Sequence, residues 1–185
     1  MRTTTPHRRI TVAGVIAAAA LAALSLAVPA GATTYPLSGR QIAVDEDNGI
    51  FKVNGSLVGD WTITAFNTTA TTPLLEANGT EVFKGCLDVR RNGCDRRDPK
   101  GTLNFTFTYQ AQFASPDSAS LIWGSCRHPI VSGTGDFAGA KGVIAMVDTP
   151  TGRGTRTDYI GNLTLPGNAR SHHPARARAA TAGAC

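Results

Sequence analysis

Four glycines surround one phenylalanine in the stretch Gly133-Thr134-Gly135-Asp136-Phe137-Ala138-Gly139-Ala140-Lys141-Gly142, and the apolar run Val143-Ile144-Ala145-Met146-Val147-Asp148 follows it directly. Glycine adopts the positive φ values of tight turns at little cost. The run behind it lacks the spacing of an amphipathic helix, so the stretch predicts a tight turn that leads into a β-strand. A dinucleotide-binding loop needs a helix behind its glycines, and this sequence supplies another strand.

Strict alternation predicts further strands. In the run 103–113, Leu103, Phe105, Phe107, Tyr109, Ala111 and Phe113 alternate with amides and hydroxyls, and Trp61, Ile63 and Ala65 alternate with Thr62 and Thr64. Successive side chains of a strand point to opposite faces, so each run places its apolar residues on one face. The same criterion predicts strands at 50–57, 59–66, 80–89, 101–113, 120–131, 139–148 and 155–165, separated by turn-forming residues. Segment 33–48 is polar and forms either an exposed turn or an N-terminal strand with an acidic tip.

Seven or eight short antiparallel strands indicate an all-β fold, either a sandwich or a closed barrel. Gly85, Gly124 and Gly161 lie inside predicted strands, which is typical of the sharp coiling of a small barrel. We therefore expect an antiparallel closed β-barrel of about eight strands. Apolar residues occupy both faces of the strand at 143–147, so either a second subunit or a local loop is expected to cover its outer face.

The ends of the chain differ from its middle. A basic start leads into an apolar stretch from Ile10 to Val28 and then to the small residues Ala30 and Ala32. This pattern predicts a signal peptide at 1–32 and a secreted, extracellular protein without an integral membrane segment after cleavage; a transmembrane anchor is the alternative. We expect one barrel domain at 33–166. The Ala/Arg-rich tail at 167–185 has no apolar periodicity and is expected to be disordered.

Charge argues against a nucleic-acid partner. The chain carries a formal net charge of +5, but six of its 18 Lys and Arg residues fall in the signal peptide and the tail. The predicted barrel has 12 basic and 13 acidic residues, so it has no large basic excess. Basic residues cluster between Arg90 and Lys100, interleaved with Asp95 and Asp98, which favours a solvated loop over a site for an anion.

The four cysteines fit an oxidising compartment. Cys86 and Cys94 flank the basic loop, so a turn could bring them together, and they are the preferred pair. The main alternative pairs Cys126 with one of them. Cys185 lies in the tail, where it is either unpaired or paired late with Cys126. The spacings fit no zinc-ligand pattern, and we expect neither a metal nor a cofactor.

Two ionisable residues are candidates for catalysis. Alternation places Glu81 on the same face as Phe83, so it points inward if Phe83 does; a buried carboxylate can act as an acid or base. The alternative is an exposed glutamate at the barrel rim. His128 precedes Pro129, and it either binds or titrates or is a hydrogen-bonded structural residue. The sequence has no nucleophile elbow, so a hydrolase is not predicted.

The glycine-rich turn and the closing segment Tyr159-Ile160-Gly161-Asn162-Leu163-Thr164-Leu165 resemble the allene oxide cyclase and dirigent superfamily of β-barrels, with Ser132 in place of the first glycine of the turn. The segment Cys126-Arg127-His128-Pro129-Ile130 is similar to one in an uncharacterised branch of secreted bacterial relatives. The resemblance implies an eight-stranded barrel with an apolar cavity, often a homodimer or homotrimer, that uses no metal or cofactor. The catalytic residues of the superfamily cannot be carried over, because no flanking motif aligns.

The leading hypothesis is a secreted, cofactor-free barrel that holds a small apolar or aromatic ligand in its lumen, which favours a binding protein over an enzyme. One alternative is an isomerase-like, cyclase-like or dirigent-like enzyme that uses the same cavity with Glu81 or His128. Another is a structural cell-envelope barrel packed solid with side chains. The residues expected to line the lumen are Trp61, Phe105, Phe107, Tyr109 and Tyr159.

Overall fold

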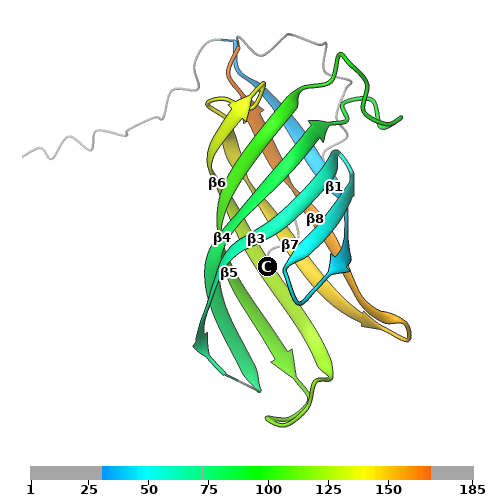
Figure 1. Ribbon diagram of the computed structural model, residues 1–185, viewed down its shortest axis with the longest axis vertical. Helices are drawn as coiled ribbons and strands as arrows, with labels where there is room; N and C mark the ends of the chain where they lie inside the picture. The colour runs from blue at the N-terminus through cyan, green and yellow to red at the C-terminus, as the bar shows by residue number, and fades with distance from the viewer. Residues whose placement is uncertain (1–30, 72, 168–185) are drawn as a thin grey trace, which may run out of the picture.

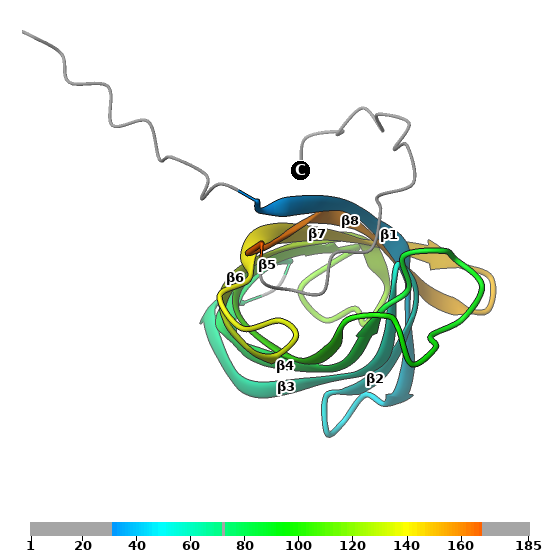
Figure 2. The ribbon, with the colours of Figure 1, turned by 90° about the horizontal axis from the view of Figure 1, so that it is seen from above.

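The computed structural model describes residues 31–71 and 73–167, which form an all-β barrel (Figure 1). Eight strands follow one another in this part of the chain, and none of it is helical. Each strand pairs antiparallel with the next, and β8 pairs with β1 to close the ring (Figure 2). The predicted closed antiparallel barrel is confirmed. The strands are β1 (Thr33–Asp45), β2 (Ile50–Gly55), β3 (Leu57–Ala70), β4 (Leu74–Leu87), β5 (Lys100–Phe113), β6 (Leu121–Gly135), β7 (Lys141–Thr151) and β8 (Gly154–Leu165).

The sequence left open whether segment 33–48 forms an exposed turn or an N-terminal strand. In the structure it forms strand β1, which ends at Asp45 and is followed by a turn. β1 pairs with β8 from Thr33 opposite Leu165 to Gln41 opposite Thr157. β3 also runs past its predicted end at residue 66, because residues 67–69 are all exposed and polar and so carry no alternating pattern. β1 supplies the edge that closes the barrel.

A β-bulge changes which side chains of β3 point inward. The register between β3 and β4 shifts between Ile63 and Ala65, so one extra residue is accommodated in β3. Alternation from Trp61 would have placed Ala65 inside. The shift instead brings Phe66 opposite Gly79, where its ring lies 5.8 Å from the ring of Phe107. The predicted placement of Ala65 on the same face as Trp61 and Ile63 is therefore wrong, and Phe66 takes its place.

The glycine-rich turn covers one end of the barrel, here called the closed end, as Figure 2 shows for the loop after β6. Phe137 is fully buried there, with its ring 6.3 Å from that of Phe83. The backbone N–H of Asp136 donates to the carbonyl of Lys100, and the N–H of Lys100 donates to the Asp136 carboxylate at 3.0 Å. A Cβ on Gly133 would lie 2.2 Å from the carbonyl oxygen of Phe137. Glycine is required because the turn folds back against its own strand.

The loop between β4 and β5 lies at the same end and holds the predicted disulfide. Cys86 and Cys94 are bonded, with Cα atoms 6.3 Å apart, so the alternative pairing of Cys126 with one of them does not occur. The carboxylate of Asp88 accepts hydrogen bonds from the backbone N–H groups of Asn92 and Gly93, which ends β4 at Leu87 rather than at residue 89. Arg90 forms an ion pair with Asp95 in this loop.

Several expectations lie outside the described residues. They are the signal peptide apart from residues 31 and 32, the tail from residue 168 onward and any bond made by Cys185. Within 31–71 and 73–167, no helix is long and apolar enough to cross a membrane. On β7, Ile144 and Met146 are buried inside the barrel, whereas Val147 on the outer face is 45 % exposed. The described chain therefore provides no loop that fully covers Val147.

Candidate functional site

A cavity of about 610 Å³ opens at the other end of the barrel, here called the open end. This end carries the turns of the β1–β2, β3–β4, β5–β6 and β7–β8 hairpins (Figure 1). Pairing between β1 and β8 stops at Gln41 and Thr157, and the residues beyond these two, on both strands, line the mouth. Most of the wall is apolar. Its large apolar side chains are Ile42, Phe51, Ile63, Phe66, Phe107, Phe113, Leu121 and Met146.

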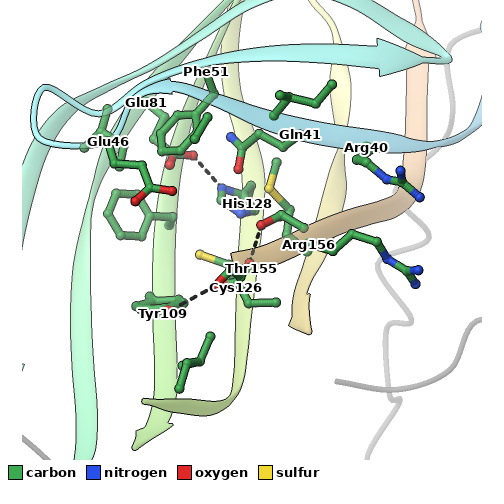
Figure 3. Close-up of a pocket in the computed structure, with 18 of the residues that line it drawn as sticks. Arg40, Gln41, Glu46, Phe51, Glu81, Tyr109, Cys126, His128, Thr155 and Arg156 are labelled. Atoms are coloured by element: carbon green, nitrogen blue, oxygen red, sulfur yellow. Dashed lines mark hydrogen bonds and ion pairs between the residues drawn. The ribbon is translucent and has the colours of Figure 1, made fainter. Parts of the chain in front are cut away.

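A buried acid–base pair forms part of this lining. Glu81 on β4 and His128 on β6 lie with Oε2 and Nδ1 2.6 Å apart, and their side chains are only 5 % and 2 % exposed (Figure 3). Glu81 points inward on the same face as Phe83, which is also buried, so the alternative of an exposed rim glutamate does not hold. The sequence singled out both residues but did not predict that they would contact each other.

Aromatic rings surround the imidazole of His128 on several sides. The ring centroids of Trp61, Phe105 and Phe107 lie 5.6, 6.4 and 6.1 Å from it. Trp61 and Phe105 stack on each other at 4.5 Å, and the imidazole stands nearly perpendicular to both. These rings fix the imidazole by packing, while Glu81 holds its Nδ1 edge. The remaining ring nitrogen, Nε2, is buried and has no hydrogen-bond partner in the described chain.

Local backbone structure supports this placement. The register between β5 and β6 is interrupted beside His128: Phe105 pairs with Ile130, the next pair is Thr108 with Arg127, and no pair lies between these two. Pro129 has no N–H, so it cannot donate a ladder hydrogen bond at this point. On its other side β6 remains paired, with His128 opposite Ile144 of β7. The histidine thus lies where the ladder to β5 is interrupted, with its ring 6.1 Å from that of Phe107.

A second polar cluster lies in the cavity wall. The hydroxyl of Tyr109 donates to Asp148 Oδ2 at 3.1 Å, and Thr157 Oγ1 donates to Asp148 Oδ1 at 2.5 Å. Figure 3 shows Tyr109 close to Cys126 in this wall. A Cβ at Gly124 would lie 2.9 Å from both the Tyr109 hydroxyl and Asp148 Oδ2, so glycine leaves room for this contact. Burial, and then the neighbouring carboxylate, raise the pKa of Tyr109 above its ordinary value.

The aromatic residues expected to line the lumen divide into two groups. Phe107 and Tyr109 line the cavity, whereas Trp61, Phe105 and Tyr159 belong to the packed core and do not. Tyr159 has a structural environment: its hydroxyl accepts from the N–H of Leu57 at 2.9 Å and donates to the carbonyl of Asn54 at 3.1 Å. Burial raises the pKa of Tyr159 to about 12.

Some lining residues were not identified from the sequence. Phe51 and Met146 lie in predicted strands and could have been found by extending the alternation of those strands. Phe66 could not, because the bulge in β3 reverses its direction. Asp148 was taken as the end of a strand, and its contact with Tyr109 depends on the register of three strands. In the described ranges, no group of three or more histidine, cysteine or acidic side chains could hold a metal ion.

Comparisons with known proteins leave the site to be interpreted from its own geometry. The resemblance of the glycine-rich turn to the allene oxide cyclase and dirigent superfamily therefore stays a hypothesis. No protein-family model matches this chain, no curated protein is significantly similar to it, and no solved structure matches its fold significantly.

Proposed function

We propose that this protein binds a small, largely apolar molecule in the cavity at the open end of the barrel. The observation that carries the proposal is a cavity of about 610 Å³ with an apolar wall and the buried Glu81–His128 pair in its lining. Small-molecule sites are typically cavities of a few hundred to a thousand cubic ångströms, mostly apolar, with a few polar groups that orient the ligand. The volume supports a ligand-binding barrel over one packed solid with side chains.

The polar groups lie where they can orient such a ligand. Phe51, Phe107 and Met146 provide apolar contact, while Glu81 and His128 provide the polar contact. The closed end is filled by Phe137, which is fully buried, so the open end is the favoured way in. A ligand would therefore enter between the hairpin turns and reach the acid–base pair with its leading end.

The second candidate function is acid–base catalysis of the isomerase or cyclase class. A carboxylate bonded to one ring nitrogen fixes the orientation of an imidazole, which can then transfer a proton through its other nitrogen. The observation that favours this candidate is the unpartnered Nε2 of His128 next to the cavity. The resemblance to the allene oxide cyclase and dirigent superfamily gives the same candidate independent, sequence-based support.

We also propose that the protein is exported. The basic start and the apolar stretch that follows it support a signal peptide. The Cys86–Cys94 disulfide supports an oxidising compartment, since such bonds rarely persist in the reducing cytosol.

Ligand binding is tested with native mass spectrometry of protein purified from its own culture medium, before and after denaturation. A molecule released on denaturation is the expected result. A matched pair of variants locates the site: Phe66→Arg places a charge in the mouth of the cavity, and Val147→Arg places one on the outer wall, where the native side chain is similarly exposed. The molecule should be lost from the first variant and retained by the second. Equal retention by both would refute the cavity as the site.

Catalysis is tested on the released molecule. Incubation with the natural protein in deuterated water should exchange carbon-bound hydrogens of that molecule if an acid or base removes and returns a proton. The increase in mass is read by mass spectrometry, with the Glu81→Leu/His128→Phe double variant as the control. Binding without any exchange in the natural protein would favour a binding protein over an enzyme.

A further inference from the structure

The two arginines at the mouth of the cavity direct their charge outward. Arg40 and Arg156 both form ion pairs with Asp158, at 3.2 and 2.7 Å, and each arginine side chain is 50 % exposed. Asp158 precedes Tyr159 on β8, and Tyr159 is buried inside the barrel, so Asp158 lies on the outer face. Figure 3 shows the side chains of Arg40 and Arg156 pointing away from the buried acid–base pair. These arginines therefore do not balance the carboxylates that face the cavity.

Asp148 faces the cavity without a cation beside it. It follows the buried Met146 and the outward-facing Val147 on β7, and it is half-buried in the cavity wall. Its two carboxylate oxygens accept one hydrogen bond each, from the hydroxyls of Tyr109 and Thr157. No ion pair of the described chain includes Asp148. A carboxylate has about four lone-pair sites, so Asp148 can still accept hydrogen bonds from a molecule in the cavity.

Deeper in the cavity, a second carboxyl oxygen lacks a partner. The side chain of Glu81 is only 5 % exposed, and its contact with His128 uses Oε2. Oε1 of Glu81 accepts no hydrogen bond from the described chain, yet it is not among the unpartnered atoms that are sealed off completely. Its accessible surface therefore faces the cavity that Glu81 lines. Buried polar atoms nearly always have a partner, so this oxygen indicates a donor that a molecule in the cavity supplies.

The Glu81–His128 pair does not supply the positive charge that Asp148 lacks. With Glu81 ionised, the pair is neutral when His128 is protonated and carries one negative charge when it is not. With a single proton on Glu81 instead, the pair is neutral again. A positive pair would need both members protonated, which leaves a buried cation without a counter-charge. Glu46, at the mouth, adds another carboxylate that is in no ion pair of the described chain.

We infer that the ligand of the cavity is an apolar molecule with an ammonium group, and that Asp148 binds this group. The inference rests on the proposed function, since it names the ligand class of the same cavity. A carboxylate in a largely apolar wall is costly without a counter-charge, which favours a cation over a neutral molecule of the same shape. A carboxylate ligand would bring a second negative charge beside Asp148. An ammonium has three donors, so Tyr109 and Thr157 can keep their hydrogen bonds.

The position of Asp148 also gives the ligand an orientation. Asp148 pairs with Thr157, the residue at which the pairing of β8 with β1 stops, so the charged end of the ligand lies near the mouth. The apolar body extends inward along Met146 and Phe107 toward the acid–base pair. Aromatic rings attract cations through their faces, and Phe107 and Phe66 supply such rings in the lining. The ligand class is therefore an apolar amine that enters with its apolar end first.

The inference is tested with three probes that share a naphthalene ring and differ in the charge of the end group. They are 2-(2-naphthyl)ethylamine, which is protonated at neutral pH, the neutral 2-(2-naphthyl)ethanol, and the anion 2-naphthylacetate. Equilibrium dialysis against the purified protein measures the affinity of each. The amine should bind about tenfold more tightly than the alcohol, in line with the contribution of one hydrogen bond to a charged group. The acetate should bind least.

Variants assign this preference to Asp148. Asp148→Asn removes the charge and keeps the shape, whereas Thr157→Lys keeps Asp148 and supplies an ammonium from the protein itself. Each should bring the affinity for the amine close to that for the alcohol, while binding of the alcohol changes little. Asp60→Asn is the matched control, because it changes the net charge as Asp148→Asn does, at an exposed residue that pairs with Lys52 and does not line the cavity. That variant should retain the full preference.

The outcomes separate this inference from the proposed function. Equal binding of the amine and the alcohol by the natural protein would overturn the cationic ligand but support the binding cavity. Tightest binding of the acetate would also overturn it and would assign the preference to Arg40 and Arg156 instead. A full amine preference in Asp148→Asn, or its loss in Asp60→Asn, would show that Asp148 is not the site. Failure of all three probes would overturn the proposed function and the inference with it.

The molecule released in native mass spectrometry gives an independent reading. Its exact mass and fragmentation should identify a basic amine with an apolar body. A neutral or acidic molecule would contradict the inference while still supporting the binding cavity.

Discussion

Oε2 of Glu81 lies 2.6 Å from Nδ1 of His128, although the two residues are 47 positions apart and on strands that are not neighbours. β5 lies between their strands. Phe105 of β5 is opposite Glu81 of β4 on one side and opposite Ile130 of β6 on the other. The pair thus reaches across the inside of the barrel, and its environment is the ring cluster of Trp61 and Phe105.

Removing one member of this pair should cost more than removing both. His128→Phe leaves the Glu81 carboxylate buried without a partner, and loss of one member of a buried ion pair typically costs about 3–5 kcal/mol. Glu81→Leu/His128→Phe replaces both with apolar groups and should cost about 1 kcal/mol. Urea unfolding measures both. A double variant as unstable as His128→Phe would contradict this prediction, because the loss of stability would then not come from the unpaired Glu81 carboxylate.

Phe137 should be essential for the closed end. Phe137→Ala leaves an empty space among buried rings, and such substitutions cost about 3–5 kcal/mol. Phe66→Ala is the control, since Phe66 is 48 % exposed at the opposite end and should cost about 1 kcal/mol or less. Thermal unfolding of the two variants gives the comparison. Similar losses in both would mean that the glycine-rich turn connects strands without closing the barrel.

The Cys86–Cys94 disulfide should stabilise the fold without affecting the cavity. It closes a loop with a sequence separation of 8, for which chain entropy gives about 2–3 kcal/mol. Cys86→Ala/Cys94→Ala should unfold at correspondingly lower urea concentration. Retention of the co-purified molecule in native mass spectrometry should be unchanged in the folded variant, since the loop lies at the closed end. Weaker binding would indicate that the loop shapes the cavity after all.

The sequence predicted the strands where only one face of a strand is buried. Leu103, Phe105 and Phe107 alternate strictly, and all three are buried. It did not predict Phe66 as a cavity residue, because the bulge before Ala65 is a property of how β3 pairs with β4. Alternation shows only whether a residue points inward, whereas a contact requires the register of every strand in between.

For the same reason the Glu81–His128 contact was not predicted, even though each residue was a candidate. Its formation depends on the shift in the β5–β6 register between Asn104 and Phe105. The volume of the cavity was also beyond the sequence, since it depends on where the β1–β8 pairing stops, at Gln41 and Thr157.

Alkaline pH should destabilise the barrel through its tyrosines. The chain has three, and burial raises the pKa of each of them, Tyr35, Tyr109 and Tyr159. For Tyr159 the folded value is about 12 against an ordinary value of 10.0. The folded state keeps a proton that the unfolded state loses, so the stabilisation is complete below pH 10 and is lost as pH rises toward 12.

The alkaline effect can be measured in two ways. Tyrosinate absorbance should stay low through pH 10 and then rise together with unfolding, because none of the three tyrosines has an ordinary pKa. The free energy of unfolding from urea titrations should fall by roughly 2 kcal/mol between pH 10 and pH 12 from Tyr159 alone. Tyr159→Phe should be less stable at neutral pH but show a smaller fall. Phenolate absorbance near pH 10 in the folded protein would contradict the buried positions.

Gly124 should control the polar cluster in the cavity wall. Gly124→Ala puts a Cβ 2.9 Å from the Tyr109 hydroxyl and from Asp148 Oδ2, which is too close unless those side chains move. Both are side-chain ends and can shift, so the variant should fold with a loss of about 1 kcal/mol from the weakened hydrogen bond. The pKa of Tyr109 should then fall toward its ordinary value, since the contact with Asp148 contributes to raising it. Spectrophotometric titration of Gly124→Ala in a Tyr159→Phe background, with Tyr159→Phe alone as the control, measures this shift. An unchanged titration curve would show that burial alone raises the pKa of Tyr109, because burial remains in Gly124→Ala when the contact with Asp148 is lost.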